Sequence, residues 1–172
     1  GALTRSDPYQ EGSKLLITFG APIAHPDDPF RATATALEMQ HQLQQLNEQL
    51  TLELPDELHL PTYIEMRMGI THGQAFASEV GWKQRREYTV MGDDVNLAAR
   101  LMSKADMGDI LISERVYNRV DRFFVTESRE PMQMKGKSRP VHAYKVLSWE
   151  GSITEVSRTS NTRFVGRDTL LL

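Results

Sequence analysis

The sequence has 172 residues, of which 40% are hydrophobic and 25% are charged, and its formal net charge is -3. This size and composition are typical of one globular domain with a buried core. The charge gives no basis for a nucleic-acid partner, which would need a basic surface. No apolar run approaches the roughly 18 residues that cross a membrane, and the first residues are not a signal peptide. The absence of cysteine excludes disulfides and thiolate metal sites. These features fit a cytoplasmic setting.

The first part of the sequence predicts a buried strand followed by a long helix. The strand covers the apolar run of residues 14–19. Asp28 and Pro29 are typical of a helix start. From there to Leu50, apolar residues recur at intervals of three and four, which is the pattern of one stripe along a helix.

Two strands joined by a turn are expected next. Residues 63–70 alternate between apolar and polar side chains, which predicts a half-buried strand. His72 and Gly73 turn the chain, and residues 74–80 return as the second strand.

The rest of the sequence predicts short helices between short strands. A helix over residues 95–104 has Asp93 or Asp94 as its expected N-cap, because a side-chain oxygen there accepts hydrogen bonds from free backbone amides. Ser113 is the expected N-cap of a helix over residues 114–120. The remaining expected strands cover residues 87–91, 109–112, 123–126 and 143–147.

This order of elements predicts an α+β domain in which helices cover a mixed sheet. We place the domain at residues 1–147. Residues 148–162 are rich in serine and threonine and predict a linker. Residues 163–172 are expected to begin a following domain, because Phe-Val-Gly-Arg is similar to the opening of a signalling P-loop ATPase. The alternative is a C-terminal tail.

Three segments, in order, carry a pattern much longer than a short motif. They are GSKLLITFGAP (12–22), MGITHGQAFASEVGWKQRREYTVMGDDVNLAARL (68–101) and MKGKSRPVHAYKV (134–146). Together they resemble the catalytic domain of class III adenylate and guanylate cyclases, over most of the chain. The order of elements also fits a ferredoxin-like ligand-binding domain unrelated to cyclases. The long middle segment argues against this alternative.

The resemblance implies a ferredoxin-like cyclase fold, with a mixed, mostly antiparallel sheet whose N-terminal strand is missing from this sequence. It also implies the conversion of ATP or GTP, with ATP favoured, to a cyclic nucleotide and pyrophosphate in signal transduction. The family acts as a head-to-tail dimer, here a homodimer, and uses Mg²⁺ or Mn²⁺. The dimer matters because one subunit supplies the metals and the other supplies polar residues to each composite site.

Four residues match positions that act on the substrate in this family. The resemblance implies that Asn96 orients the ribose and that Arg100 stabilises the charge developing on the phosphate. It implies that Lys135 holds the terminal phosphates, as a point charge on a flexible stem. Thr89 lies where the purine edge is read, and its hydroxyl suits adenine without excluding guanine. The plainer interpretations are solvated polar residues for Asn96 and Arg100, a charged turn for Lys135 and a strand-favouring residue for Thr89.

The sequence departs from the family at the metal ligands. The first metal-binding aspartate lies upstream of this sequence in the family. Ser13 stands where the second aspartate is expected, and a hydroxyl is a poor substitute because magnesium prefers charged oxygen ligands. Tyr9 stands where adenylate cyclases carry a purine-selecting lysine. The histidines show no metal-ligand spacing.

Two functional interpretations follow. In the first, the chain is part of a working cyclase whose missing metal ligand lies upstream, and Asn96, Arg100 and Lys135 favour this. In the second, it is a catalytically silent, cyclase-like module for regulation or dimerisation, which Ser13 and Tyr9 favour. We expect little activity from this chain alone.

Overall fold

The computed structural model describes residues 2–9, 12–21, 23–53, 63–82, 85–136 and 138–150. The residues expected to begin a following domain, 163–172, lie outside this set. Among the described residues, no helix combines the length and the hydropathy that crossing a bilayer requires.

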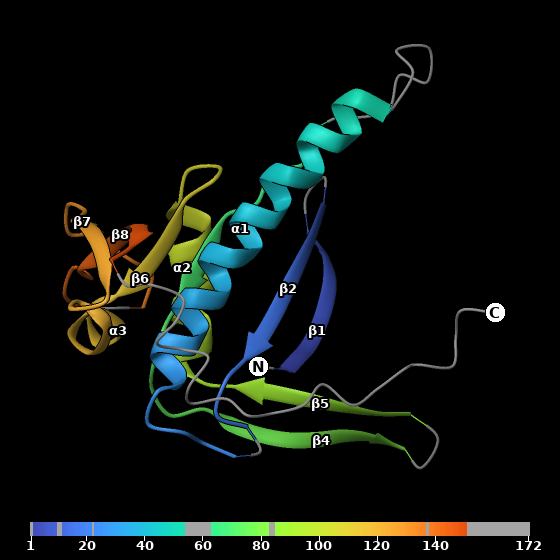
Figure 1. Ribbon diagram of the computed structural model, residues 1–172. Helices are drawn as coiled ribbons and strands as arrows, with labels where there is room; N and C mark the ends of the chain where they lie inside the picture. The colour runs from blue at the N-terminus through green and yellow to red at the C-terminus, as the bar shows by residue number, and fades with distance from the viewer. Residues whose placement is uncertain are drawn as a thin grey trace.

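The described residues form three helices and eight strands in an α+β arrangement (Figure 1). The helices are α1 (Asp28–Glu53), α2 (Asp93–Lys104) and α3 (Glu114–Val120). The first strands are β1 (Ala2–Tyr9), β2 (Gly12–Thr18), β3 (Met68–Ile70) and β4 (Phe76–Trp82). The last strands are β5 (Arg85–Met91), β6 (Ile110–Ser113), β7 (Phe124–Ser128) and β8 (Ala143–Trp149).

The strands pair in three sheets. The central sheet has the order β3-β6-β8-β7, in which β3 and β6 are parallel and the other neighbours are antiparallel. β1 and β2 form an antiparallel hairpin, and so do β4 and β5. In Figure 1 the central sheet lies on one side of α1 and the β1–β2 hairpin on the other. The sheet is therefore mixed and mostly antiparallel, as the sequence predicts.

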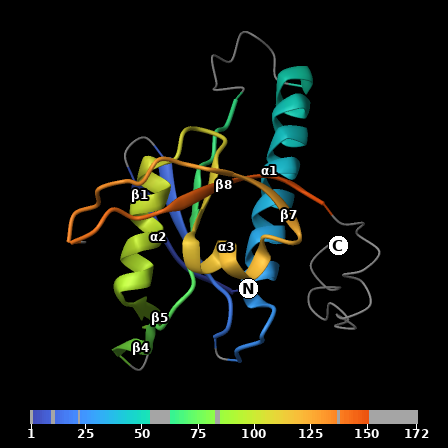
Figure 2. The same cartoon turned by 90° about the vertical axis from the view of Figure 1, so that its left-hand side faces the viewer.

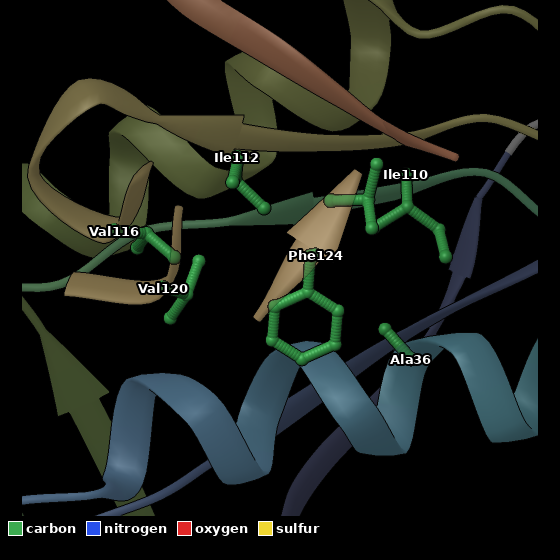
Figure 3. Close-up of a cluster of buried hydrophobic side chains, with 7 residues drawn as sticks. Ala36, Ile110, Ile112, Val116, Val120 and Phe124 are labelled. Carbon is green, nitrogen blue, oxygen red and sulfur yellow. The ribbon is translucent and has the colours of Figure 1, made fainter. Parts of the chain in front are cut away.

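The central sheet has a packed core on each face, because successive side chains of a strand point to opposite sides. Ile110 and Ile112 of β6 face α1 and α3, where Phe124 fills the space beside Ala36 (Figure 3). Leu111 points the other way and packs with Leu101 of α2. α1 and α3 therefore cover one face of the sheet, and α2 covers the other.

One expected strand begins too early, and one observed strand was not expected. β3 begins at Met68, not at residue 63, because the Ile64 backbone pairs with a side chain in place of a strand. Its N–H donates to Asn47 Oδ1 and its carbonyl accepts from Asn47 Nδ2, each at 2.8 Å. β1 was not expected at all. Its sequence is polar and includes Pro8, and its partner β2 provides the pairing that makes it a strand.

Of the two expected N-caps, the one of α2 is wrong and the one of α3 is confirmed in its position. The N-cap of α2 is Gly92, with no side-chain cap. Asp94 lies inside the first turn, where its carboxylate is 3.7 Å from Nη1 of Arg115. Ser113 does stand at the N-cap of α3, but its hydroxyl makes no cap hydrogen bond and is buried without a partner.

A buried carboxylate ties β8 to the turn before β6. The Asp109 side chain is only 7% exposed, and its oxygens lie 2.6 Å from Nζ of Lys145 and 2.8 Å from Nη2 of Arg129. The same Arg129 nitrogen is 3.2 Å from Asp106, whose side chain is 83% exposed. Arg129 therefore has a buried partner, Asp109, and an exposed partner, Asp106, whose contributions to stability can be compared directly.

Asp109→Ala should lower the free energy of unfolding by about 3 kcal/mol, because it leaves two cations without a buried partner. Urea unfolding followed by circular dichroism measures this. Asp106→Ala is the matched control and should cost less than about 1 kcal/mol, because exposed ion pairs contribute little. Equal effects of the two substitutions would contradict the conclusion that the buried carboxylate of Asp109 stabilises the fold more than the exposed one of Asp106.

Candidate active site

Helix α2 presents Asn96 and Arg100 on the side turned away from the sheet. Its apolar face carries Leu97, Leu101 and Ala105, which pack against the core of the central sheet. Asn96 is exposed and Arg100 is half-buried. They lie four residues apart and so share one face of the helix. The expected pair is therefore brought together.

The turn that carries Lys135 lies beside Arg100. A methyl carbon placed on Gly136 would be 3.7 Å from Nη2 and 3.9 Å from Nη1 of Arg100. Gly136 has φ of 76°, a left-handed conformation that favours glycine. Lys135 itself is exposed. Two segments far apart in the sequence thus place a guanidinium next to a lysine-bearing turn.

A shared apolar cluster explains why these two segments lie side by side. Met134, next to Lys135, is 3% exposed, and Leu101, next to Arg100, is fully buried. Both belong to the same apolar cluster. Packing of the two apolar side chains brings their charged neighbours to the same edge of the domain.

The other two expected residues lie on hairpins. Thr89 is in β5, opposite Ser78 of β4, and its side chain lies outside the described residues. Ser13 is exposed on β2, opposite Pro8 of β1, in a different sheet from the one that α2 covers. β1 contacts β5, so the two hairpins are neighbours.

The start of α2 is fixed to the end of β3. The hydroxyl of Thr71 donates to the carbonyl of Asp94 at 2.7 Å. Burial lowers the pKa of the adjacent His72 below its ordinary value, and the charge of Arg119 lowers this pKa further. The imidazole is therefore neutral at neutral pH. The hydrogen bond from Thr71 ties the first turn of the helix that bears Asn96 to the end of β3.

A cleft that the sequence did not predict opens next to the start of α2, where Gly92 is part of its lining. It has a volume of about 640 Å³ and lies where the ends of β2, β4 and β5 meet. Its lining includes Phe19, Gln74, Phe76, Met91 and Gly92. No sequence signal identifies it, because its walls come from three separate segments.

Comparison with known proteins decides the family. Residues 10–148 match the model of the adenylate and guanylate cyclase catalytic domain. The chain belongs to this family. The match covers β2, the β4–β5 hairpin, α2 and the central sheet up to Ser148 of β8, whereas β1 lies outside it. The matched residues include both groups of candidate residues.

Related cyclases agree in sequence and in structure. An adenylate cyclase of Mycobacterium tuberculosis is 30% identical over 126 residues, which are 73% of this chain and 26% of that protein. The chain therefore spans about a quarter of the length of this relative. The crystal structure of the adenylyl cyclase CyaB from P. aeruginosa has a TM-score of 0.71 at 28% identity, covering 83% of this chain and 71% of that one. That of the guanylyl cyclase Cya2 also has a TM-score of 0.71, at 34% identity, covering 84% and 70%.

Cyclases generally depend on a divalent metal, so the donor groups of this domain matter. Magnesium prefers charged oxygen ligands, whereas Ser13 offers a hydroxyl on an exposed strand position. Within the described part of the chain, no group of three or more histidine or acidic side chains is placed to hold a metal ion. These residues do not fit a metal site by themselves, and we assign no step to a metal.

Gly69→Ala should displace α2 from β3, because the new methyl carbon would lie 2.2 Å from the carbonyl oxygen of Ala98 and 2.5 Å from the backbone nitrogen of Met102. Backbone atoms cannot rotate aside, so we expect a loss of about 2 kcal/mol in the free energy of unfolding. The amide NMR signals of Asn96 and Arg100 should shift with the helix. Ser103→Ala, at an exposed position of the same helix, is the control and should leave these signals in place.

Proposed function

We propose that this cyclase domain supplies the ribose- and phosphate-binding half of a composite active site that cyclises ATP, rather than GTP. The observation that carries the proposal is the guanidinium of Arg100 lying against Gly136, in the turn that bears Lys135. Two cations that reach one edge of a domain suit a substrate with several negative charges. A nucleoside triphosphate has this property.

The reaction defines what these residues do. The ribose 3′-oxygen loses its proton and forms a bond to the α-phosphorus, while the bond from that phosphorus to pyrophosphate breaks. Negative charge moves onto the phosphate oxygens and the leaving pyrophosphate. The guanidinium of Arg100 stabilises the charge on the α-phosphate, and Lys135 holds the terminal phosphates. The amide of Asn96, one turn before Arg100, orients the ribose so that its hydroxyl is aligned for attack.

Completion of the site requires a second copy of the chain. Asn96 and Arg100 lie on α2, whereas Ser13 lies on the β1–β2 hairpin, in a separate sheet. In a head-to-tail homodimer each α2 faces the hairpin of the other subunit. The preference for ATP rests on Thr89, whose hydroxyl can accept from the adenine amino group or donate to a ring nitrogen. The relatives' names include both adenylate and guanylate cyclases, so base choice needs its own measurement.

The second candidate is a catalytically silent module that binds nucleotide or dimerises without turnover. The observation that favours it is Ser13, an exposed hydroxyl where the family carries a carboxylate. The charge stabilisation that a metal provides is several kcal/mol, so its loss slows the reaction by roughly a thousandfold or more.

Arg100→Ala should lower the rate of cyclic AMP formation by at least about a hundredfold, because each preorganised donor to transition-state charge contributes that much. Asn96→Ala should have an effect of similar size through misorientation of the ribose. The assay uses the complete protein with ATP or GTP and manganese. Ser103→Ala, on the same helix, should retain full activity. Unchanged activity in Arg100→Ala would exclude this residue from the site.

Ser13→Asp separates the two candidate functions. If the hydroxyl limits metal binding, the carboxylate should raise the rate and the affinity for manganese, because a charged oxygen ligand replaces a neutral one. Ser13→Asn has a similar size without the charge and should not do so. The absence of product from both the unmodified protein and Ser13→Asp would overturn the proposal in favour of the silent module.

A further inference from the structure

The loop that joins β7 to β8 carries Lys135 and spans residues 129–142, all of which the structure describes except residue 137. In Figure 2 this loop, drawn in orange, extends away from β7 and β8 towards α2. Most of its described side chains are exposed, and only that of Met134 is fully covered. The contacts that hold this loop in place therefore decide where Lys135 lies.

Backbone hydrogen bonds join the two arms of the loop to each other. The N–H of Arg129 donates to the carbonyl of Ala143 at 2.9 Å. Further along, Met132 and Val141 exchange two hydrogen bonds, each of 2.9 Å. All the atoms of these bonds belong to the loop or to β8. They align the arms but do not orient the loop relative to α2.

A buried carboxylate outside the loop provides this orientation. Oδ2 of Asp109 is 2.8 Å from Nη2 of Arg129, and Oδ1 is 2.6 Å from Nζ of Lys145. Arg129 begins the loop and Lys145 follows it in β8, so one carboxylate holds the chain on both sides of the loop. Water screens these ion pairs little, because the side chain of Asp109 is only 7% exposed.

The position of Asp109 is itself set by the segment that follows α2. Asp109 lies five residues after Lys104, the last residue of that helix. Its N–H donates to the carbonyl of Asp106 at 3.0 Å, and its carbonyl accepts from the N–H of Met68 at 2.9 Å. The ion pair between Asp109 and Arg129 thus connects the loop that bears Lys135 to the continuation of the helix that bears Arg100.

We propose that Arg129 is a positioning residue for Lys135, and that its ion pair with Asp109 sets the loop so that Lys135 and Arg100 reach the same triphosphate. The inference rests on the proposed function. The apolar cluster of Leu101 and Met134 attracts the two segments, but hydrophobic attraction has no preferred direction. Hydrogen bonds between a guanidinium and a carboxylate do have one, because the donors of arginine form a rigid fork. The buried ion pair therefore supplies the orientation that the cluster lacks.

Arg129→Met tests this role, because it removes the cation, keeps a long side chain and leaves Asp109 paired with Lys145. The affinity for 3′-deoxy-ATP, which lacks the attacking hydroxyl, should fall by about threefold to tenfold, because a displaced charge attracts the terminal phosphates less. The affinity for AMP should be unchanged, since AMP has no terminal phosphates. A residue that only stabilised the fold would affect both nucleotides alike. Calorimetric titration of the complete protein with manganese measures both affinities.

Two further substitutions control this measurement. Arg122→Met removes the same charge at an exposed position before β7 and should change neither affinity. Asp109→Asn breaks the ion pair from the other side at nearly constant volume, and should reproduce the selective loss for 3′-deoxy-ATP. The two routes to the broken pair keep the test independent of whether either variant alone folds.

Lys135→Ala separates this inference from the proposed function. It should lower the affinity for 3′-deoxy-ATP by at least about tenfold, the size expected for hydrogen bonds to charged groups. Adding Arg129→Met should then have little further effect, because Arg129 acts through Lys135. If Lys135→Ala shows its loss but Arg129→Met and Asp109→Asn show none, or weaken both nucleotides equally, the positioning role is overturned and the proposed function stands. If Lys135→Ala has no effect, the proposed role of Lys135 fails and this inference fails with it.

Discussion

Strand β6 is buried from both sides, and the positions of the three described helices depend on this burial. Ile110 and Ile112 are fully buried on the face that α1 and α3 cover, and Leu111, between them, is 1% exposed on the face of α2. A strand of this kind is a continuous apolar run, without polar alternation. Because α2 uses its apolar face against Leu111, its outer face is left for Asn96 and Arg100. The placement of the candidate site is thus a consequence of core packing.

The approach of Arg100 to the Lys135 turn has the same origin. Two cationic segments repel each other when no anion lies between them, so electrostatics alone would not bring them together. The burial of Leu101 and Met134 in one apolar cluster supplies the missing attraction. Under the proposed function, an incoming triphosphate turns the repulsion into two favourable interactions. The apolar contact therefore preorganises the site before the substrate arrives, which is what makes such charges effective in the transition state.

Local patterns in the sequence predicted much of the fold. The helix starting at Asp28, the strands on either side of α3 and the spacing of Asn96 and Arg100 all follow from rules that span a few residues. The incorrect predictions concern residues whose interaction partners lie far away in the sequence. Residues 63–67 alternate like a strand, but Asn47 of α1 takes the backbone hydrogen bonds of Ile64. Asp94 suits an N-cap, but Arg115 of α3 faces its carboxylate. The contact between Arg100 and Gly136 was unpredictable for the same reason, since it joins two distant segments.

Binding and turnover have separate requirements in this domain. Cations and an amide are sufficient to hold a triphosphate, because they act on charges that are present in the ground state. Turnover needs extra stabilisation of charge that appears only in the transition state, and equal binding of both states does not accelerate the reaction. Under the proposed function, Ser13 stands in place of a metal-binding aspartate. This replacement removes negative charge from the groups that support turnover and leaves the groups that bind the triphosphate intact. A triphosphate complex would therefore be compatible with either candidate function. The rate of pyrophosphate release distinguishes them, because under the proposed function it depends on whether the hydroxyl of Ser13 can replace a carboxylate at the metal.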